Sequence, residues 1–255
     1  MTFALLYHDV VEPERQDSAG FPGQLAARYK LDPALFEAHL DAIAATGVEI
    51  GVLRPDGSPP AAALTFDDAG ASALMVAASL ERRGWFGHFF VPTSRLGTPG
   101  FLAPDDVRAL AHRGHAVGSH SHTHPTYMGK LPRAALEREW LESRSILAEV
   151  LDEEPEVASV PGGFLTQAVI ETAAAAGYRV LMTSEPVARV RKVGDLVTVG
   201  RFCIWSTTPA ARAAAYVTGS RAARAQLWLE WNAKGMAKRL SPRAYQALRR
   251  LRARR

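Results

Sequence analysis

Short apolar segments alternate with helix-like segments along residues 3–183, and this alternation constrains the fold more than any other feature. Repeated βα units joined by short loops predict a parallel sheet or a (β/α) barrel, complete or incomplete. The segments predicted as strands are 3–7, 61–66, 87–92, 116–118, 156–160 and 178–183, and those predicted as helices are 32–47, 72–83, 104–114, 133–151 and 167–176.

Composition fits one folded unit with a real core. Of the 255 residues, 47% are hydrophobic and 22% are charged, as in an ordinary globular protein. The single cysteine, Cys203, excludes an intramolecular disulfide and a zinc site made of several cysteines. We found no export signal and no apolar run long enough to span a bilayer, so a cytoplasmic location is expected.

The C-terminal segment differs in charge from the rest of the chain. Residues 210–255 contain 12 Lys and Arg but one acidic residue, Glu230, whereas the remainder is mildly acidic. We therefore divide the chain into a barrel, residues 1–209, and a basic helical extension, residues 210–255. A basic amphipathic helix with Trp228 and Trp231 is typical of helices on anionic membranes, and a solvated or core-packed helix is the alternative.

Three of the eight histidines lie within the segment Gly118–Pro125. His120 and His124 are four residues apart, so a helical turn there would place both imidazoles on one face. Two imidazoles can hold a divalent ion such as zinc if a third ligand comes from elsewhere. A solvated histidine-rich loop is the alternative interpretation.

Two adjacent acids, Asp67 and Asp68, follow the predicted strand 61–66. Neighbouring side chains of a strand point to opposite faces, but a bend at the strand end can bring both carboxylates to one cavity. One acid could then bind a metal while the other acts as a base. Alternatively, the pair caps the following helix, 72–83.

His8 follows the first predicted strand, residues 3–7. Catalytic groups of (β/α) barrels lie at the carboxyl ends of strands, so His8 is a candidate catalytic residue. A structural role is the alternative for a lone histidine.

Thr65-Phe66-Asp67-Asp68, followed some fifty residues later by His120-Ser121-x-x-His124, resembles the motifs T-F-D-D and H-[ST]-x-x-H of the polysaccharide deacetylase family. The strand Phe89-Phe90-Val91-Pro92, the turn Phe101-Leu102 and the segment Gly114–His120 match as well, and the similarity covers roughly residues 3–205. Members of this family are metal-dependent carbohydrate N-deacetylases with a NodB-like distorted (β/α)7 barrel. The resemblance implies the same fold and the same class of reaction for this chain.

The resemblance also implies individual roles. Asp68, His120 and His124 would bind one divalent ion, zinc by preference, with cobalt, nickel or manganese as alternatives. Asp67 would be the general base, and Ser121 would shape the histidine loop. The remaining histidines of this region, His115 and His122, match no ligand position and are expected to be structural.

The third motif departs from the family pattern. Pro161-Gly162-Gly163 stands where the family has R-x-P-[YF]-G, so the Gly162 N–H, next to Pro161, would help stabilise the oxyanion. Ser159 occupies the place of the family's arginine. We expect that Arg201 could reach the base instead.

The family's C-terminal general acid is missing, because no histidine follows His124. Tyr7-His8, however, resembles the N-terminal Y-H motif of a rearranged branch that includes the poly-N-acetylglucosamine deacetylases. The resemblance implies that His8 is the general acid, with Tyr7 packing on its ring or bonding to it.

Together these features predict a hydrolase that removes an N-acetyl or similar N-acyl group from an amino sugar. The substrate would be a glycan, or a lipid-linked or soluble sugar intermediate, and the tail could bind the inner membrane face. The altered third motif leaves a catalytically silent sugar-binding barrel as the alternative. We expect no nucleic-acid partner, since the tail belongs to no known nucleic-acid-binding module.

Overall fold

A computed structural model describes residues 2–163, 165–188 and 190–240. In this part of the chain, nine strands form one sheet in the order β7-β8-β6-β5-β4-β3-β2-β1-β9. All neighbouring strands are parallel except β7 and β8. The strands are β1 (Phe3–Tyr7), β2 (Ala62–Phe66), β3 (His88–Val91), β4 (Ala116–Ser119), β5 (Val157–Ser159), β6 (Val180–Met182), β7 (Arg191–Val193), β8 (Leu196–Val199) and β9 (Arg201–Cys203).

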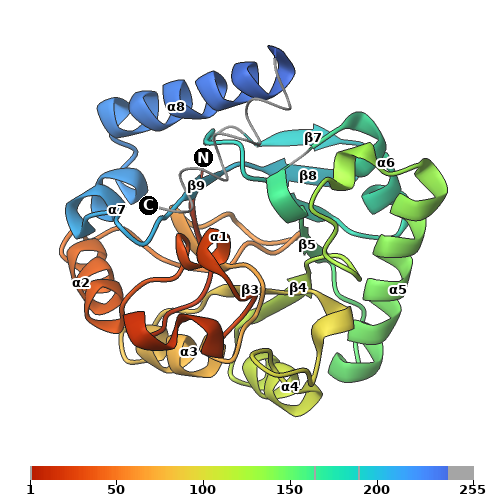
Figure 1. Ribbon diagram of the computed structural model, residues 1–255, viewed down its shortest axis with the longest axis horizontal. Helices are drawn as coiled ribbons and strands as arrows, with labels where there is room; N and C mark the ends of the chain where they lie inside the picture. Colours follow the sequence, from red (N-terminus) through yellow and green to blue (C-terminus); the bar gives the residue numbers. More distant parts are fainter. Residues whose placement is uncertain (1, 164, 189, 241–255) are drawn as a thin grey trace.

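Helices surround the sheet, and most of them connect one parallel strand to the next (Figure 1). The α-helices are α1 (Gln24–Ala27), α2 (Pro33–Ala44), α3 (Ala73–Glu81), α4 (Pro104–His112), α5 (Arg133–Leu151), α6 (Gln167–Ala175), α7 (Ala210–Val217) and α8 (Arg221–Leu240). Four short 3-10 turns are η1 (Pro13–Ser18), η2 (Thr93–Arg95), η3 (Met128–Lys130) and η4 (Pro161–Gly163).

The (β/α) architecture predicted from the sequence is confirmed. The sheet is open in the described residues, because its end strands β7 and β9 pair with other strands but not with each other. The predicted strands and helices up to residue 183 all form, and α5 has the predicted bounds.

Local chemistry explains the start of α2. Asp32 is its N-cap, and one carboxylate oxygen accepts hydrogen bonds from the N–H groups of Ala34 and Leu35. Pro33 occupies the first helical turn, where its missing N–H costs nothing.

Aromatic packing beneath β1 and β2 makes their carboxyl ends a firm base for side chains. All five residues of β2 are buried. The Phe66 ring stacks between those of Tyr7 and Phe89, with centroid distances of 5.4 and 5.0 Å. Because a core is packed as densely as a crystal, residues at these strand ends have little freedom to shift.

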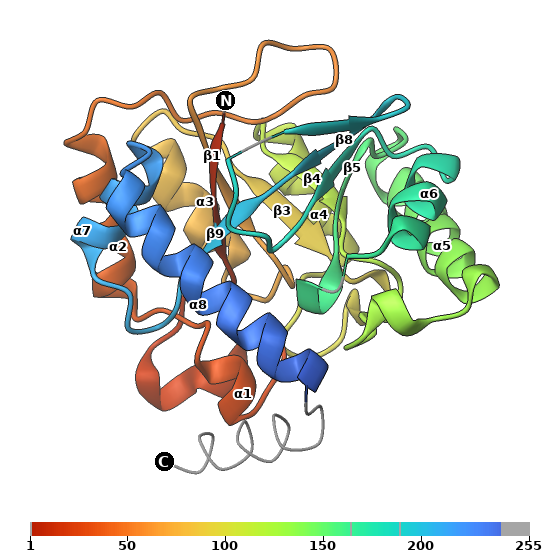
Figure 2. The same ribbon diagram turned by 90° about the horizontal axis from the view of Figure 1, so that it is seen from above.

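The C-terminal helices lie at the edge formed by β1 and β9 (Figures 1 and 2). In α7, Tyr216 is buried and stacks on Phe202 of β9 at 5.3 Å. From α8, Leu227 is buried and the Arg224 guanidinium lies 5.3 Å from the Phe3 ring. Residues 210–240 thus continue the fold as two helices, and the division at residues 209 and 210 stays a prediction.

The expected basic helix only partly falls in the described residues. Its segment 243–252 lies outside them. Of the helices that are described, none combines the length and the apolar character needed to cross a bilayer.

Candidate active site

The carboxyl ends of β1, β2 and β4 bring the predicted site residues together. Tyr7 pairs with Phe66 in parallel register, so His8 and Asp67 leave the sheet side by side. The neighbouring strand β4 ends at Ser119, and the N–H of His120 donates to the Val91 carbonyl at 2.8 Å. This edge is where parallel sheets place catalytic groups.

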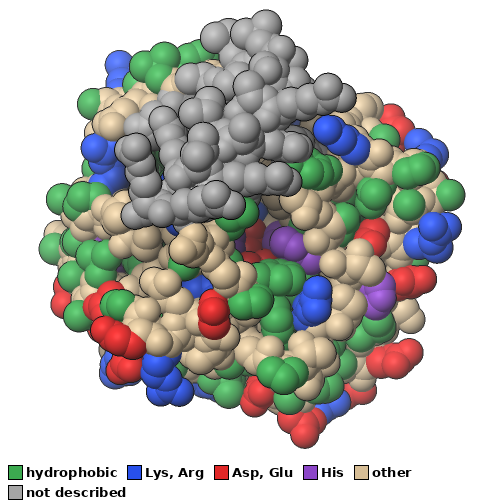
Figure 3. All heavy atoms as spheres, in the orientation of Figure 1, with side chains coloured by type: hydrophobic (Ala, Val, Ile, Leu, Met, Phe, Trp, Pro, Cys, Tyr) green, Lys and Arg blue, Asp and Glu red, His purple; other side chains and the backbone are tan. Residues whose placement is uncertain are grey.

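Asp68, His120 and His124 form a cluster whose candidate ligand atoms all lie within 4.8 Å of one another. Asp68 Oδ1 is 3.6 Å from His120 Nε2 and 3.3 Å from His124 Nε2. Figure 3 shows histidine and acidic atoms next to each other near the centre of this face. One carboxylate and two imidazoles are a common ligand set for a catalytic divalent ion such as zinc.

Two further observations fit a cation at this cluster. Asp68 Oδ1 is buried and has no hydrogen-bond partner within the described residues, which an ion would supply. His120 Nδ1 lies 3.1 Å from the carbonyl oxygen of Ser159. Because a carbonyl only accepts, that nitrogen carries the hydrogen and the Nε2 lone pair faces Asp68.

The predicted helical turn between His120 and His124 is wrong. This segment is a loop, and both Ser121 and His124 have left-handed backbone conformations, with φ of 61° and 57°. The Ser121 hydroxyl accepts a hydrogen bond from the His124 N–H at 3.2 Å. The Glu139 carboxylate of α5 accepts from the N–H groups of His122 and Thr123 at 3.0 and 2.8 Å. The imidazoles therefore converge through a tight, externally held loop.

Arg201 makes the expected contact with Asp67. Two guanidinium nitrogens donate to the two carboxylate oxygens at 2.6 and 2.8 Å, and both side chains are buried. The Ser159 hydroxyl donates to the same carboxylate and accepts from Arg201 at 2.7 Å. Arg201 also donates to the Thr65 hydroxyl and to the Thr183 carbonyl, so all its N–H groups have acceptors nearby. The small Ser159 leaves space for a guanidinium that arrives from β9.

The charges of the site separate its two acids. Burial alone would raise the pKa of Asp67, but the charges of Arg201 and His120 and the Arg201 hydrogen bonds lower this pKa well below its usual value. Burial, helped by the charges of Asp67 and Asp9, raises the pKa of Asp68. Asp67 is thus held as an anion, whereas Asp68 lacks such a partner, and a bound cation would favour its ionised form.

Burial also keeps the cluster histidines neutral. The pKa falls to about 3 for His120 and to about 4 for His124, mainly through loss of hydration. Neutral imidazoles are the form that binds metals.

His8 is half-buried beside this cluster, and the charges of Asp67 and His124 act on it. Burial lowers the pKa of His8 to about 4, and its Nδ1 has no hydrogen-bond partner in the described residues. The expectation that Tyr7 fixes this ring is wrong, since the Tyr7 hydroxyl lies 3.2 Å from His39 Nδ1 in the core. Tyr29 packs on His8 instead, with ring centroids 4.6 Å apart.

A second aromatic residue, Phe21, covers His124 with ring centroids 4.5 Å apart. The loop that carries Phe21 is fixed by the buried Lys30, whose ammonium group donates to the carbonyls of Gln16, Ala19 and Phe21 at 2.6 to 2.7 Å. Sequence reasoning missed Tyr29, Phe21 and Lys30, because the irregular segment 11–31 has no pattern that predicts these contacts.

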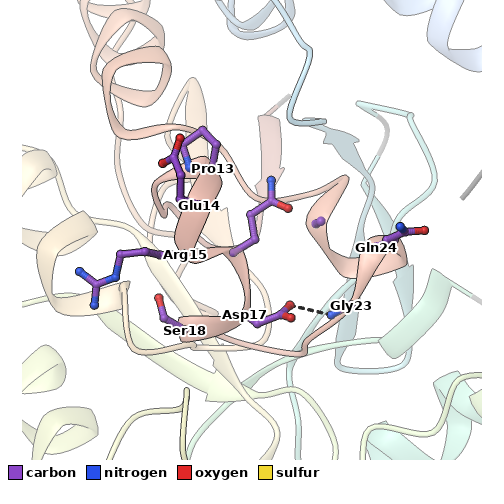
Figure 4. Close-up of a pocket in the computed structure, with 9 residues that line it drawn as sticks. Pro13, Glu14, Arg15, Asp17, Ser18, Gly23 and Gln24 are labelled. Carbon is purple, nitrogen blue, oxygen red and sulfur yellow. Dashed lines mark hydrogen bonds between the residues drawn. The ribbon is translucent and has the colours of Figure 1, made fainter. Parts of the chain in front are cut away.

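The same segment carries a surface pocket of about 410 Å³ between η1 and α1 (Figure 4). Asp17 accepts a hydrogen bond from the Gly23 N–H at its rim, at 2.8 Å. The lining residues, which include Glu14 and Arg15, contain none of the clustered metal ligands. The candidate metal site is therefore separate from this pocket.

The two other histidines of the region have structural partners, as expected. His115 is buried, its Nδ1 accepts from the Gly87 N–H at 3.1 Å, and its Nε2 lies 2.8 Å from Glu81. His122 Nδ1 lies 3.0 Å from the Thr93 hydroxyl. Neither ring joins the Asp68 cluster.

Pro161 and Gly162 follow β5 on the same side of the sheet. Gly162 has φ of 64°, a conformation that favours glycine over the aromatic residue of the family pattern. The role of its N–H in binding an oxyanion stays a prediction.

Comparison with known proteins identifies the family to which this chain belongs. The family model described as polysaccharide deacetylase matches residues 54–181, half of the chain, and this range includes Asp67, Asp68, His120 and His124. The chain belongs to the polysaccharide deacetylase family. His8 and Arg201 lie outside the matched range.

Solved structures show the same fold at low sequence identity. A polysaccharide deacetylase from Bacillus cereus has a TM-score of 0.70 and 19% identity, over 85% of this chain and 68% of that one. A Streptococcus pyogenes deacetylase in complex with acetate has a TM-score of 0.67 and 19% identity, over 82% of this chain and 94% of that one. IcaB from Ammonifex degensii has a TM-score of 0.66 and 21% identity, over 86% of this chain and 97% of that one. No curated protein matches the sequence.

Proposed function

We propose that this protein is a metal-dependent hydrolase that removes an N-acetyl or similar N-acyl group from an amino sugar. The carrying observation is the Asp68, His120 and His124 cluster beside an Asp67 carboxylate that Arg201 holds ionised. Family membership supports a carbohydrate as the substrate. We infer one divalent ion, with zinc preferred because two of the three ligands are imidazoles.

The ion would be held by Asp68 Oδ1 and the Nε2 atoms of His120 and His124. When bound, it would polarise the acyl carbonyl and lower the pKa of a water molecule. These tasks suit an amide, which is a poor electrophile.

Asp67 is the base in this proposal. Its carboxylate oxygen lies 3.7 Å from His120 Nε2, at the edge of the ligand cluster, where it can accept a proton from the attacking water. Arg201 and Ser159 fix both oxygens, so the carboxylate cannot rotate away. The N–H of Gly162 would stabilise the developing oxyanion.

His8 is the general acid in this proposal. An amine leaves poorly unless it is protonated, and His8 is the further titratable ring beside the cluster. Because burial keeps this ring neutral in the free protein, it must first take up a proton from solvent before it can donate one to the amine. Its unpartnered Nδ1 is available for this transfer.

We also propose that α8 binds an anionic membrane surface at the cytoplasmic face. Trp228 and Leu229 are adjacent and exposed, 48% and 61%, while Leu227 on the other side of the helix is buried. The segment that follows is rich in Lys and Arg. Exposed apolar side chains beside basic residues are what interfacial helices use. This would suit a lipid-linked or soluble sugar intermediate as substrate.

The base assignment is tested by Asp67→Asn. The variant should retain the metal but lose about 10²–10⁴-fold in turnover on an N-acetyl sugar, the usual scale for loss of a general base. Metal content by elemental analysis and amine release are the two readouts. Near-normal turnover would assign the base elsewhere.

A further inference from the structure

Two arginines make cation–π contacts with aromatic rings on either side of the candidate site. The Arg95 guanidinium lies 5.3 Å from the ring of Phe21, and Phe21 covers His124. The Arg28 guanidinium lies 5.3 Å from the ring of Trp205. Trp205 in turn stacks on Tyr29 at 4.7 Å, and Tyr29 packs on His8.

These stacks tie each guanidinium to a site residue through aromatic contacts. Arg28 is fixed at its backbone as well, because its carbonyl accepts from the Ser206 N–H at 2.8 Å. Both arginines are exposed.

Neither guanidinium has a carboxylate within 4.0 Å in the part of the chain that the structure describes. This contrasts with Arg201, which pairs with Asp67, and with seven further arginines outside the site that each pair with an acid. They are Arg82, Arg83, Arg108, Arg113, Arg133, Arg144 and Arg179. Arg95 and Arg28 therefore keep an unneutralised charge, and their ring contacts connect that charge to residues of the candidate site.

A guanidinium that rests on an aromatic face is held in place and keeps the N–H groups along its edge available. Those donors match the oxygens of a phosphate or carboxylate and bind them in a bidentate manner. The acids of the site do not compete for them, since Asp67 is paired with Arg201 and Asp68 belongs to the ligand cluster.

We propose that the substrate is an anionic amino sugar, and that Arg95, with Arg28 on the opposite side, binds its phosphate or carboxylate group. This rests on the proposed N-deacetylase function and narrows its substrate class. Neutral N-acetyl sugars are then poor substrates, and Arg95 and Arg28 set the specificity.

The test compares three sugars on the zinc-loaded full-length protein. N-acetylglucosamine 1-phosphate carries a phosphate, N-acetylmuramic acid carries a carboxylate, and the methyl glycoside of N-acetylglucosamine is neutral. We expect a higher kcat/KM for at least one anionic sugar, and the better of the two identifies the anionic group. Arg95→Gln and Arg28→Gln should each lower that preference about tenfold, the value of one charge-assisted hydrogen bond. Arg108→Gln, at a half-buried arginine of α4 that pairs with Asp105, removes the same charge and should leave the preference unchanged.

Binding to the chelator-treated protein, measured by calorimetry, gives a readout that needs no turnover. The anionic sugars should bind more tightly than the neutral one, and Arg95→Gln should abolish the difference. Equal kcat/KM for neutral and anionic sugars, with no effect of either variant, would overturn this proposal and leave the deacetylase function standing. Hydrolysis of no sugar at all would refute that function, and the binding difference would still decide whether the arginines recognise anions.

Discussion

Arg201 and Asp67 are the residue pair on which the chemistry depends most. The guanidinium neutralises a buried carboxylate and keeps it ionised, which a general base requires. Breaking a buried pair leaves an uncompensated charge and costs about 3–5 kcal/mol of stability. In the proposed mechanism, the pair therefore contributes both to the stability of the fold and to the action of the base.

Replacing Arg201 by Gln should move the acidic limb of the pH profile of kcat/KM to higher pH. The limb reports protonation of the base, and Arg201 lowers the pKa of Asp67, so its removal raises that pKa. Arg201→Lys should move the acidic limb less than Arg201→Gln does, because lysine keeps the positive charge but not the two parallel hydrogen bonds. A variant that stays folded with an unmoved acidic limb would show that Asp67 is not the titrating base.

His8→Ala should leave metal affinity intact and lower turnover on amides. Activity on an activated ester should fall far less, because that leaving group needs no proton. The ratio of amide to ester turnover is the measurement. An equal loss on both substrates would indicate a structural role for His8.

Among single residues, the resemblance to the family motifs predicted a cluster of Asp68, His120 and His124, and the structure brings these three side chains together. It also suggested Arg201, from the missing arginine at Ser159. It could not predict Tyr29 against His8, since that contact depends on how an irregular loop folds back over β1.

Among the elements, the histidine loop between β4 and α5 decides whether the ligands converge. Glu139 accepts hydrogen bonds from the N–H groups of His122 and Thr123, which lie between the left-handed residues Ser121 and His124. The expected helical turn was wrong because spacing alone cannot distinguish a turn of helix from a tight loop that also brings positions four apart together. Strands β7 to β9 were missed as well, since three or four residues are too few to show a period.

Glu139→Gln should weaken metal binding about 10- to 100-fold, the usual effect of disturbing groups that orient metal ligands. Competition with a zinc chelator measures this affinity. Glu142→Gln is a matched control on the same helix, since Glu142 only lies 3.6 Å from His122 and is exposed. Unchanged zinc affinity in Glu139→Gln would mean that the loop holds its shape without this carboxylate.

The double variant Trp228→Glu with Leu229→Glu should reduce binding to anionic vesicles without unfolding the protein, because both side chains are exposed. Vesicle sedimentation at two salt concentrations measures the binding. The control is Leu141→Glu, which introduces the same residue at an exposed leucine of α5. Equal binding by the double variant and the control would refute the membrane role of α8.

For the whole molecule, buried histidines make stability depend on pH. His88 is fully buried on β3, and burial lowers its pKa to about 3, below the usual 6.5. The contribution of the neutral His88 to the free energy of unfolding is complete above pH 6.5. It is lost progressively as the pH falls towards 3, because only the unfolded chain takes up the proton in this range. The Leu53 N–H donates to its Nε2 at 2.9 Å, so the neutral ring also has a structural use.

His88→Gln should be less stable than the wild type at pH 7, but the difference should shrink by about 2 kcal/mol between pH 6.5 and pH 5. Urea unfolding at several pH values gives the free energies of unfolding. A difference that stays constant over this range would show that the folded protein accepts the proton on His88.

The architecture as a whole was predictable from the sequence, because alternating strands and helices specify a parallel sheet and α2 and α5 carry clear helix signals. That β7 and β9 do not pair to close the sheet was not predictable, since closure depends on pairing between strands far apart in the chain.

The central claim is metal-dependent removal of an N-acyl group from an amino sugar. Its most direct test measures amine release from N-acetylated sugars by chelator-treated protein, before and after zinc is restored. We expect no release without metal, recovery with one ion per chain, and neither binding nor release in His124→Ala. Full activity after chelation would contradict the metal dependence. A zinc-loaded protein that binds sugars but releases no amine from any of them would contradict the enzyme and support a silent sugar-binding barrel.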